Sequence, residues 1–197
     1  MFTRSSPGPS GPRFLKALSI CLNDLGKLAW CFVRELTDPE IRAAFLNCSK
    51  GEAKRLNLPR ELAEQPWSEL DFLGWRDPQA PDRAYLVAEI DGRPQAVVLR
   101  ASSGASWQPR RSICSLCVTT HTGGVSLLVA PLAGPAGRQG NSVGAYMCSD
   151  LACPLYVRGL RETGTKIHES LTQEQRIERM RDNLAGFLAK VRGTDRG

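Results

Sequence analysis

Apolar and polar positions along this chain follow helical spacing in some stretches and strand-like alternation in others. The clearest helical pattern begins after Thr172, which is positioned to cap a helix with Gln175 three residues later. This pattern predicts an amphipathic C-terminal helix with apolar positions Ile177, Met180, Leu184, Phe187, Leu188 and Val191. A second apolar stripe at helical spacing runs over residues 14–36 and predicts an amphipathic helix there.

Two further helix starts are marked by capping boxes. Glu40 follows Thr37 by three residues, and Glu52 follows Ser49 in the same way. We therefore expect a helix after Thr37, where the main domain begins, and a second short helix that ends near Leu56.

Alternating positions in residues 84–90 and 95–101 predict two strands. Asp91-Gly92 joins them, and this dipeptide is a strong signal for a β-hairpin. The stretch before the hairpin, residues 66–83, holds aromatic side chains among turn-forming residues. We expect that stretch to be irregular.

The second half of the chain predicts a further pair of strands, at residues 125–130 and 142–147. A Gly-rich connection, residues 134–141, separates them, and a short helix is expected within residues 150–160. Helices and strands are thus segregated rather than alternating as in βαβ units. The predicted fold class is α+β.

Composition and charge limit the class of protein. The chain is 42% hydrophobic and 23% charged, which is ordinary for a globular protein, and its net charge of +6 invites an anionic partner. No apolar run approaches the roughly 18 residues of a membrane span, and a secretory signal is poorly matched, so we expect a cytoplasmic protein. The predicted organisation is a flexible leader with an amphipathic helix at 1–36, the main domain at 37–192 and a tail at 193–197.

The strongest chemical signal is a set of four cysteines. Two of the seven cysteines are spaced C-x2-C, and a second pair at C-x4-C follows about thirty residues later. Such pairs supply a closed tetrahedral set of four sulfurs, the arrangement that structural zinc prefers, with iron as the main competitor. Incidental buried thiols and redox chemistry are the alternatives. The predicted zinc ligands are Cys114, Cys117, Cys148 and Cys153.

The sequence signals for a role at the metal site are weaker for other residues near these cysteine pairs. His121 is a rival ligand, although with four cysteines available we expect it beside the metal shell or on the surface. Basic neighbours would offset the surplus charge of four thiolates: Arg110, Arg111 and Arg158. The remaining cysteines have no partner at ligand spacing and are treated as small apolar residues: Cys21, Cys31 and Cys48. No catalytic triad, Walker loop or carboxylate pair stands out, so we expect a binding protein rather than an enzyme.

Two long stretches carry a family resemblance. The run RRSICSLCVTTHTGGVSLLVAPLAGPAGRQGNSVGAYMCSDLACPLYVRG, followed by HESLTQEQRIERMRDNLAGFL, closely resembles the treble-clef zinc-finger domain of elongation factor G-binding proteins. These are the FusB-type proteins associated with fusidic acid resistance. The upstream stretch AAFLNCSKGEAKRLNLP…WSELDFLGWRDPQAPDRAYLV is similar to the same domain, so the likeness covers roughly residues 37–192. It implies that the four cysteines hold one structural zinc ion.

The resemblance also implies a function. Proteins of this type bind elongation factor G on the ribosome and promote its release, so we expect the same partner here. A nucleic-acid or ribosome-binding zinc protein, with ribosomal RNA as partner, is the alternative. Candidate partner contacts lie in the Gly-rich connection between the ligand pairs, close to the zinc: Arg138, Gln139, Asn141 and Ser142.

The N-terminal part departs from the family pattern. The resistance proteins carry a sizeable helical N-terminal domain, whereas only residues 1–36 precede the shared region here. Two interpretations of these residues stay open: a native extension, or a gene model that starts upstream of a true start near Val33.

Overall fold

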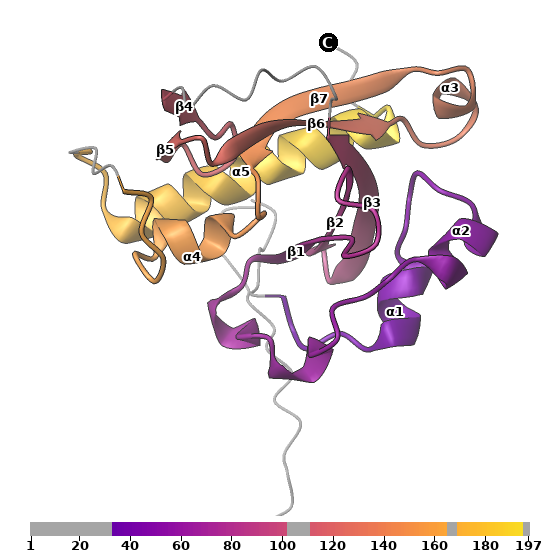
Figure 1. Cartoon of the computed structure of the whole chain (residues 1–197), viewed down its shortest axis with the longest axis horizontal. Coiled ribbons are helices and arrows are strands. Elements are labelled where there is room, and N and C mark those ends of the chain that lie inside the picture. The colour runs from indigo at the N-terminus through magenta and orange to yellow at the C-terminus, as the bar shows by residue number, and fades with distance from the viewer. Residues whose placement is uncertain (1–32, 102–110, 165–168, 195–197) are drawn as a thin grey trace, which may run out of the picture.

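A five-stranded antiparallel sheet forms the centre of the protein (Figure 1). The structure is a computed structural model, and it describes residues 33–101, 111–164 and 169–194. The strands lie in the order β1-β2-β3-β6-β7. Their bounds are β1 Phe72–Arg76, β2 Arg83–Ile90, β3 Arg93–Ala101, β6 Val125–Pro131 and β7 Ser142–Cys148.

Smaller elements surround this sheet. A two-stranded sheet pairs β4 (Arg111–Ile113) with β5 (Thr120–Thr122). The helices are α1 (Asp38–Ala43), α2 (Lys50–Arg55), η1 (Leu62–Glu64), η2 (Trp67–Glu69), α3 (Pro135–Arg138), α4 (Cys153–Val157) and α5 (Gln173–Arg192). The fold is α+β, as predicted. Within the described residues, no helix combines the length and the apolar character needed to cross a membrane.

Strand β2 is buried on both faces and separates two apolar cores. Leu86 points into one core, which α5 covers with residues such as Leu184. Its neighbours Tyr85 and Val87 point into the other core, which also holds Ile41 of α1. Because successive strand residues face opposite sides, an almost continuous apolar run in β2 serves both layers. Figure 1 shows α5 along the β6–β7 ribbon, with α1 and α2 beyond β2 and β3.

The capping boxes and the hairpin turn that the sequence predicted are present in the structure. The carboxylate of Glu40 accepts hydrogen bonds from the Thr37 backbone and hydroxyl, at 2.8 and 2.7 Å. Equivalent capping boxes start α2 at Ser49 and α5 at Thr172. The β2–β3 hairpin turns through Asp91 and Gly92 with φ of 52° and 69°, the left-handed conformations that a tight two-residue turn requires.

Two loop predictions were wrong. Residues 66–83 are not irregular throughout, because β1 forms there and pairs along its full length with β2. The Gly-rich connection contains a one-turn helix, α3. In both cases the turn-forming residues obscured the sequence signal of a regular element. Hydrogen bonds to another segment, either distant or adjacent in sequence, stabilise that element.

The helix expected over residues 14–36 lies outside the described residues except for its last four. Those four residues are not helical. Val33 and Leu36 are buried in the α1 core, and the Val33 backbone donates a hydrogen bond to the Leu70 carbonyl at 3.1 Å. The end of the predicted leader therefore packs into the body, while the domain division itself stays a prediction.

Candidate metal centre

The four predicted cysteines meet in one buried cluster. Their sulfurs all lie within 4.8 Å of one another, and each residue is at most 1% exposed. The Sγ atoms of Cys114 and Cys153 are 3.7 Å apart, and those of Cys117 and Cys148 are 3.5 Å apart. A tetrahedron with Zn–S bonds of about 2.3 Å has sulfur–sulfur edges of about 3.8 Å. The cluster therefore fits one tetrahedral zinc ion.

The first ligand pair sits on a tight turn between β4 and β5. The Val118 N–H donates to the Cys114 carbonyl at 2.9 Å, and the Leu116 N–H points to the Cys114 sulfur at 3.4 Å. Val118 closes the turn with a φ of 58°, which is unusual for a β-branched residue and needs support from its surroundings. Helix α5 supplies some, because the Asn183 side chain donates to the Leu116 carbonyl at 2.9 Å.

The second pair joins the end of β7 to the start of α4. Cys148 is the last residue of the strand and Cys153 the first of the helix. Between them Leu151 has a φ of 57° and donates its N–H to the Cys148 carbonyl at 2.9 Å. This turn packs against β1 at Gly74, where an added Cβ would lie 2.4 Å from the Leu151 Cβ. Glycine is therefore required at this contact.

The protonation of the cluster explains why it needs a cation. Hydrogen bonds from the other three thiols lower the pKa of Cys114. Hydrogen bonds to Cys114 and Cys117 raise the pKa of Cys148, and burial raises the pKa of Cys153. Four buried thiols thus cannot all ionise by themselves, since each added negative charge opposes the next. A divalent cation offsets that charge and favours the deprotonated ligands.

His121 lies beside the sulfurs, within the protein rather than on its surface. It is 4% exposed, and its Nε2 is 3.3 Å from the Cys148 sulfur and 2.9 Å from the Thr119 hydroxyl. The same hydroxyl lies 2.8 Å from the Cys117 sulfur. The Tyr156 ring packs perpendicular to the imidazole at a centroid distance of 4.7 Å. His121 and Thr119 therefore orient the ligands, a role that the sequence suggested for His121 but not for Thr119.

Of the arginines expected near the thiolates, Arg158 lies in a buried ion pair. Arg158 is held by the fully buried Asp71, with a closest contact of 2.6 Å. Arg181 of α5 contacts the same carboxylate at 2.6 Å. Arg111 is exposed at the start of β4, and Arg110 lies outside the described residues. Arg158 thus forms an ion pair with a buried carboxylate distant in sequence, and its effect on the thiolates stays a prediction.

Cys48, the remaining cysteine among the residues that the structure describes, does not join the metal cluster. Cys48 is half-buried and free, and burial, with a smaller effect from Glu52, raises the pKa of its thiol to about 11. It therefore stays protonated and behaves as the small apolar residue that we expected. Cys21 and Cys31 lie outside the described residues.

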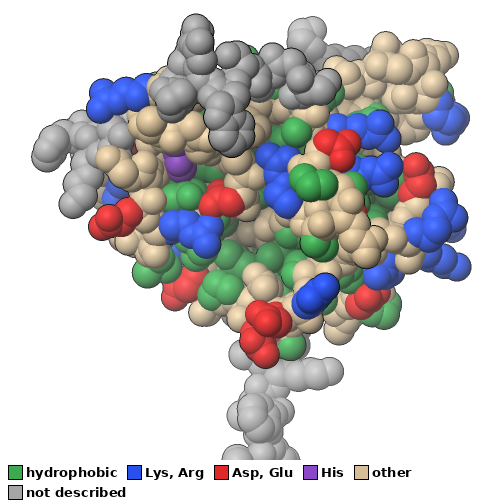
Figure 2. Space-filling model, in the orientation of Figure 1, with side chains coloured by type: hydrophobic (Ala, Val, Ile, Leu, Met, Phe, Trp, Pro, Cys, Tyr) green, Lys and Arg blue, Asp and Glu red, His purple; other side chains and the backbone are tan. Residues whose placement is uncertain are grey.

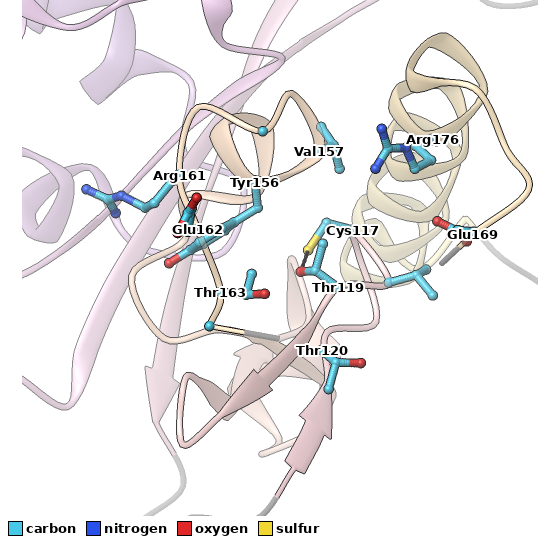
Figure 3. A pocket seen from close by; sticks show the side chains of 13 residues that line it. Cys117, Thr119, Thr120, Tyr156, Val157, Arg161, Glu162, Thr163, Glu169 and Arg176 are labelled. Carbon is cyan, nitrogen blue, oxygen red and sulfur yellow. Dashed lines mark hydrogen bonds between the residues drawn. The ribbon is translucent and has the colours of Figure 1, made fainter. Parts of the chain in front are cut away.

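A pocket of about 690 Å³ opens beside the cluster (Figure 3). In this view Tyr156 of α4 and Arg176 of α5 lie on opposite sides of Cys117 and Thr119. Cys117 lines the pocket but is only 1% exposed, so the sulfurs stay shielded from solvent.

The predicted partner contacts are exposed but not close to the zinc. Arg138, Gln139, Asn141 and Ser142 lie at the α3 end of the β6–β7 hairpin. Ser142 and Cys148 are the two ends of β7 and lie six positions apart, which corresponds to about 20 Å at roughly 3.4 Å per residue. The expectation that this segment adjoins the metal was wrong. Because β7 is extended, its two ends lie far apart in space although they are close in sequence.

The segment at this end is also more ordered than a Gly-rich loop suggests. The Asn141 backbone donates to the Ala136 carbonyl at 3.1 Å, and the Leu132 N–H donates to the Asn141 carbonyl at 2.9 Å. A Cβ on Gly137 would lie 1.8 Å from the Leu132 carbonyl oxygen. The glycine allows α3 to fold back tightly on the strand.

Large apolar side chains are exposed at the zinc end of the same hairpin. Ile113 and Tyr146 are each 56% exposed. The Ser115 N–H donates to the Tyr146 carbonyl at 2.6 Å, so the first ligand turn adjoins β7 at this point. We call Ile113 and Tyr146 the zinc-end patch. Tyr146 was not singled out by the sequence analysis.

Comparison with known proteins agrees with the fold and the site. Together, the fold and the four-cysteine site define a treble-clef zinc-binding protein. The family model described as FBP C-terminal treble-clef zinc-finger matches residues 40–191, and the chain belongs to this family. No curated protein matches the sequence. A similar solved structure is that of the fusidic acid resistance protein FusC, with 19% identity and a TM-score of 0.47. The match covers 71% of this chain and 53% of the FusC chain. This chain therefore spans about half the length of FusC.

Proposed function

We propose that this chain is a zinc-stabilised binding protein that binds elongation factor G in the cytoplasm and promotes its release from the ribosome. The observation that carries the proposal is the family match over residues 40–191, which includes all four cysteines of the cluster. A closed four-sulfur site leaves no open coordination position for a substrate, so the metal serves folding rather than catalysis.

The surface of the β6–β7 hairpin supports a protein partner. Exposed aromatic and branched apolar side chains are enriched at interface centres, and the zinc-end patch offers Ile113 and Tyr146. The closed metal site fixes this surface before binding, which lowers the entropic cost of forming a complex.

Tyr146 of the zinc-end patch and Ser142 at the α3 end lie on one side of β7. Ser142 and Tyr146 are four residues apart, and strand residues an even number apart point to the same face. Opposite Tyr146 lies Leu127 of β6, and opposite Ser142 lies Pro131. We propose this outer hairpin face as the contact surface, with Tyr146 as its apolar anchor and Arg138, Gln139, Asn141 and Ser142 at its polar end.

Calorimetry with purified elongation factor G tests this proposal. The zinc-loaded chain should form a complex, and Tyr146→Ala should weaken it by about tenfold or more, as truncating an interface anchor does. Arg138→Ala should have a smaller effect, because the contact lies at the rim. Zinc content should equal one per chain in every variant.

Leu160→Ala is the matched control, since Leu160 is 60% exposed but lies after α4 and outside the hairpin. Its affinity should match that of the wild-type chain. Absence of binding to the factor, both free and on ribosomes, would overturn the proposal.

Nucleic-acid binding is the second candidate, and the net charge of +6 favours it. The two candidates differ in salt dependence. Phosphate-led binding loses affinity steeply as salt rises, whereas a shape-matched protein interface loses less. A titration of ribosomal RNA and of elongation factor G at several salt concentrations therefore separates them.

A further inference from the structure

A second cavity, of about 550 Å³, lies on the other side of the molecule, between α2 and the β2–β3 pair. Three arginines from three elements line it: Arg55 of α2, Arg83 of β2 and Arg100 of β3. We call this cavity the arginine pocket. Figure 2 shows Lys and Arg side chains gathered on the side of the molecule that carries α2.

Two of these arginines lie side by side on adjacent strands of the sheet. Arg83 and Arg100 are direct partners in the antiparallel β2–β3 register. Like charges directly opposite each other destabilise a strand pair. A third guanidinium, from Arg55, adds to the same repulsion. The Glu52 carboxylate, whose pKa Arg55 and Arg100 help to lower, offsets part of this charge, and a bound anion would offset the rest.

The carboxylates of the arginine pocket are already engaged by other donors. Asp77 accepts hydrogen bonds from the Asn57 side chain and the Gln79 backbone, both at 2.9 Å, and from the Tyr85 hydroxyl at 2.8 Å. These donors engage both of its oxygens, with two hydrogen bonds to Oδ1 and one to Oδ2. The Asp77 carboxylate therefore serves the turn that it organises rather than the arginines.

The second carboxylate, Glu52, belongs to the α2 capping box. It accepts hydrogen bonds from the Ser49 backbone and hydroxyl, both at 2.8 Å. Within the part of the chain that the structure describes, neither acid forms an ion pair with Arg55, Arg83 or Arg100. Three positive and two negative side chains leave the arginine pocket with a surplus of one positive charge.

We propose that the arginine pocket binds a phosphate group. Planar guanidinium groups donate paired hydrogen bonds to oxyanions, and phosphate presents several oxygens to donors that approach from different directions. Arginines from a helix and two strands approach from such different directions. The bound anion would neutralise the repulsion between Arg83 and Arg100.

Two sources can supply this chemistry: a free or small-molecule phosphate, and a phosphodiester of RNA. The test therefore has two arms, with inorganic phosphate and with single-stranded hexauridylate as probes. Calorimetry of the full zinc-loaded chain measures both. We expect binding of at least one probe, weakened about tenfold or more by Arg100→Gln and further by the double variant R83Q/R100Q.

The matched control is Arg93→Gln, which removes the same charge from an exposed position at the opposite end of β3. Its affinity should stay within about twofold of the wild-type value. Binding of phosphate alone identifies a small phosphorylated ligand, and binding of hexauridylate with the same arginine dependence identifies a nucleic-acid backbone; both support the proposal. Absence of binding, or equal losses in Arg93→Gln and Arg100→Gln, would overturn it.

Thermal unfolding shows whether the variants fold. Without phosphate, Arg100→Gln should melt at or above the wild-type temperature, because one of two facing charges has been removed. With phosphate, the wild-type chain should gain stability that the variant lacks. Phosphate also stabilises proteins by exclusion from their surface, and Arg93→Gln measures that general effect. An Arg100→Gln protein that melts lower and keeps the full phosphate response would contradict the pocket.

Discussion

The zinc end of the molecule and its α1–α2 side are stabilised in different ways. At the zinc end the elements are short, with three residues in each of β4 and β5 and five in α4. The α1–α2 side packs buried apolar side chains against the sheet, among them Ile41, Trp75 and Val87. Strands and helices this short do not persist alone. Helices α1 and α2 are also short, with six residues each, whereas the zinc end adds metal ligands to the core that α5 covers. The comparison teaches that short elements are held by packing alone on one side and by packing together with a metal on the other.

A buried ion-pair cluster connects the two regions. Asp71, at the start of β1, is fully buried and contacts Arg158, just after α4, and Arg181 of α5. One carboxylate thus joins the sheet to both helices near the metal. The stability of the zinc end should depend on this contact as well as on the ligands.

Removal of the metal should have the largest effect. Cys148→Ser or chelation should abolish stoichiometric zinc and destabilise residues 111–160. The cost should be on the order of 5 kcal/mol or more, because structural zinc contributes about 10–16 kcal/mol apparent in small modules. Native mass spectrometry and chemical denaturation measure the two effects.

Cys48→Ser is the control for this experiment, since Cys48 lies outside the metal cluster. It should keep one zinc per chain. Unchanged zinc content and unchanged stability in Cys148→Ser would contradict the four-cysteine site.

Truncation in the other region should cost stability without loss of metal. Ile41 is fully buried in the α1 core, and Ile41→Ala should lower the free energy of unfolding by about 2–5 kcal/mol through lost burial and a residual cavity. Urea denaturation measures this change. Zinc content should stay at one per chain, and release of zinc from Ile41→Ala would show that the two regions are not separately stabilised.

A smaller effect is expected from Asp71→Asn. Removing the charge takes the closest carboxylate from two largely buried guanidinium groups, although Arg158 keeps its 3.7 Å contact with Glu69, and loss of such a buried pair costs about 3 kcal/mol. The contrasting variant is Glu40→Gln, whose ion pair with Arg34 is between exposed side chains and should contribute at most about 1 kcal/mol. Equal losses in the two variants, measured by the same denaturation, would contradict the role assigned to Asp71.

The elements that could be predicted were those with local signals. The capping boxes at Thr37, Ser49 and Thr172 start helices, and Asp91-Gly92 forms the hairpin turn. The four cysteines were found because spacing alone carries the signal for a metal site. Each of these features is contained in a few neighbouring residues.

The features that could not be predicted depend on contacts between distant residues. Strand β1 contains a glycine and is flanked by turn formers, and only its pairing with β2 makes it a strand. Asp71 and Arg181 are 110 residues apart in sequence, and Arg83 meets Arg55 only after the sheet and α2 have packed. The distance between Ser142 and the zinc likewise follows from the strand conformation of β7.

The most direct test of the proposed binding surface is hydrogen–deuterium exchange of the zinc-loaded chain, free and with elongation factor G. The account predicts slower amide exchange in peptides that cover β4 and the β6–β7 hairpin, including Ile113 and Tyr146, with exchange in α1 and α2 unchanged. Protection confined to α1 and α2, or no protection at saturating factor, would contradict it.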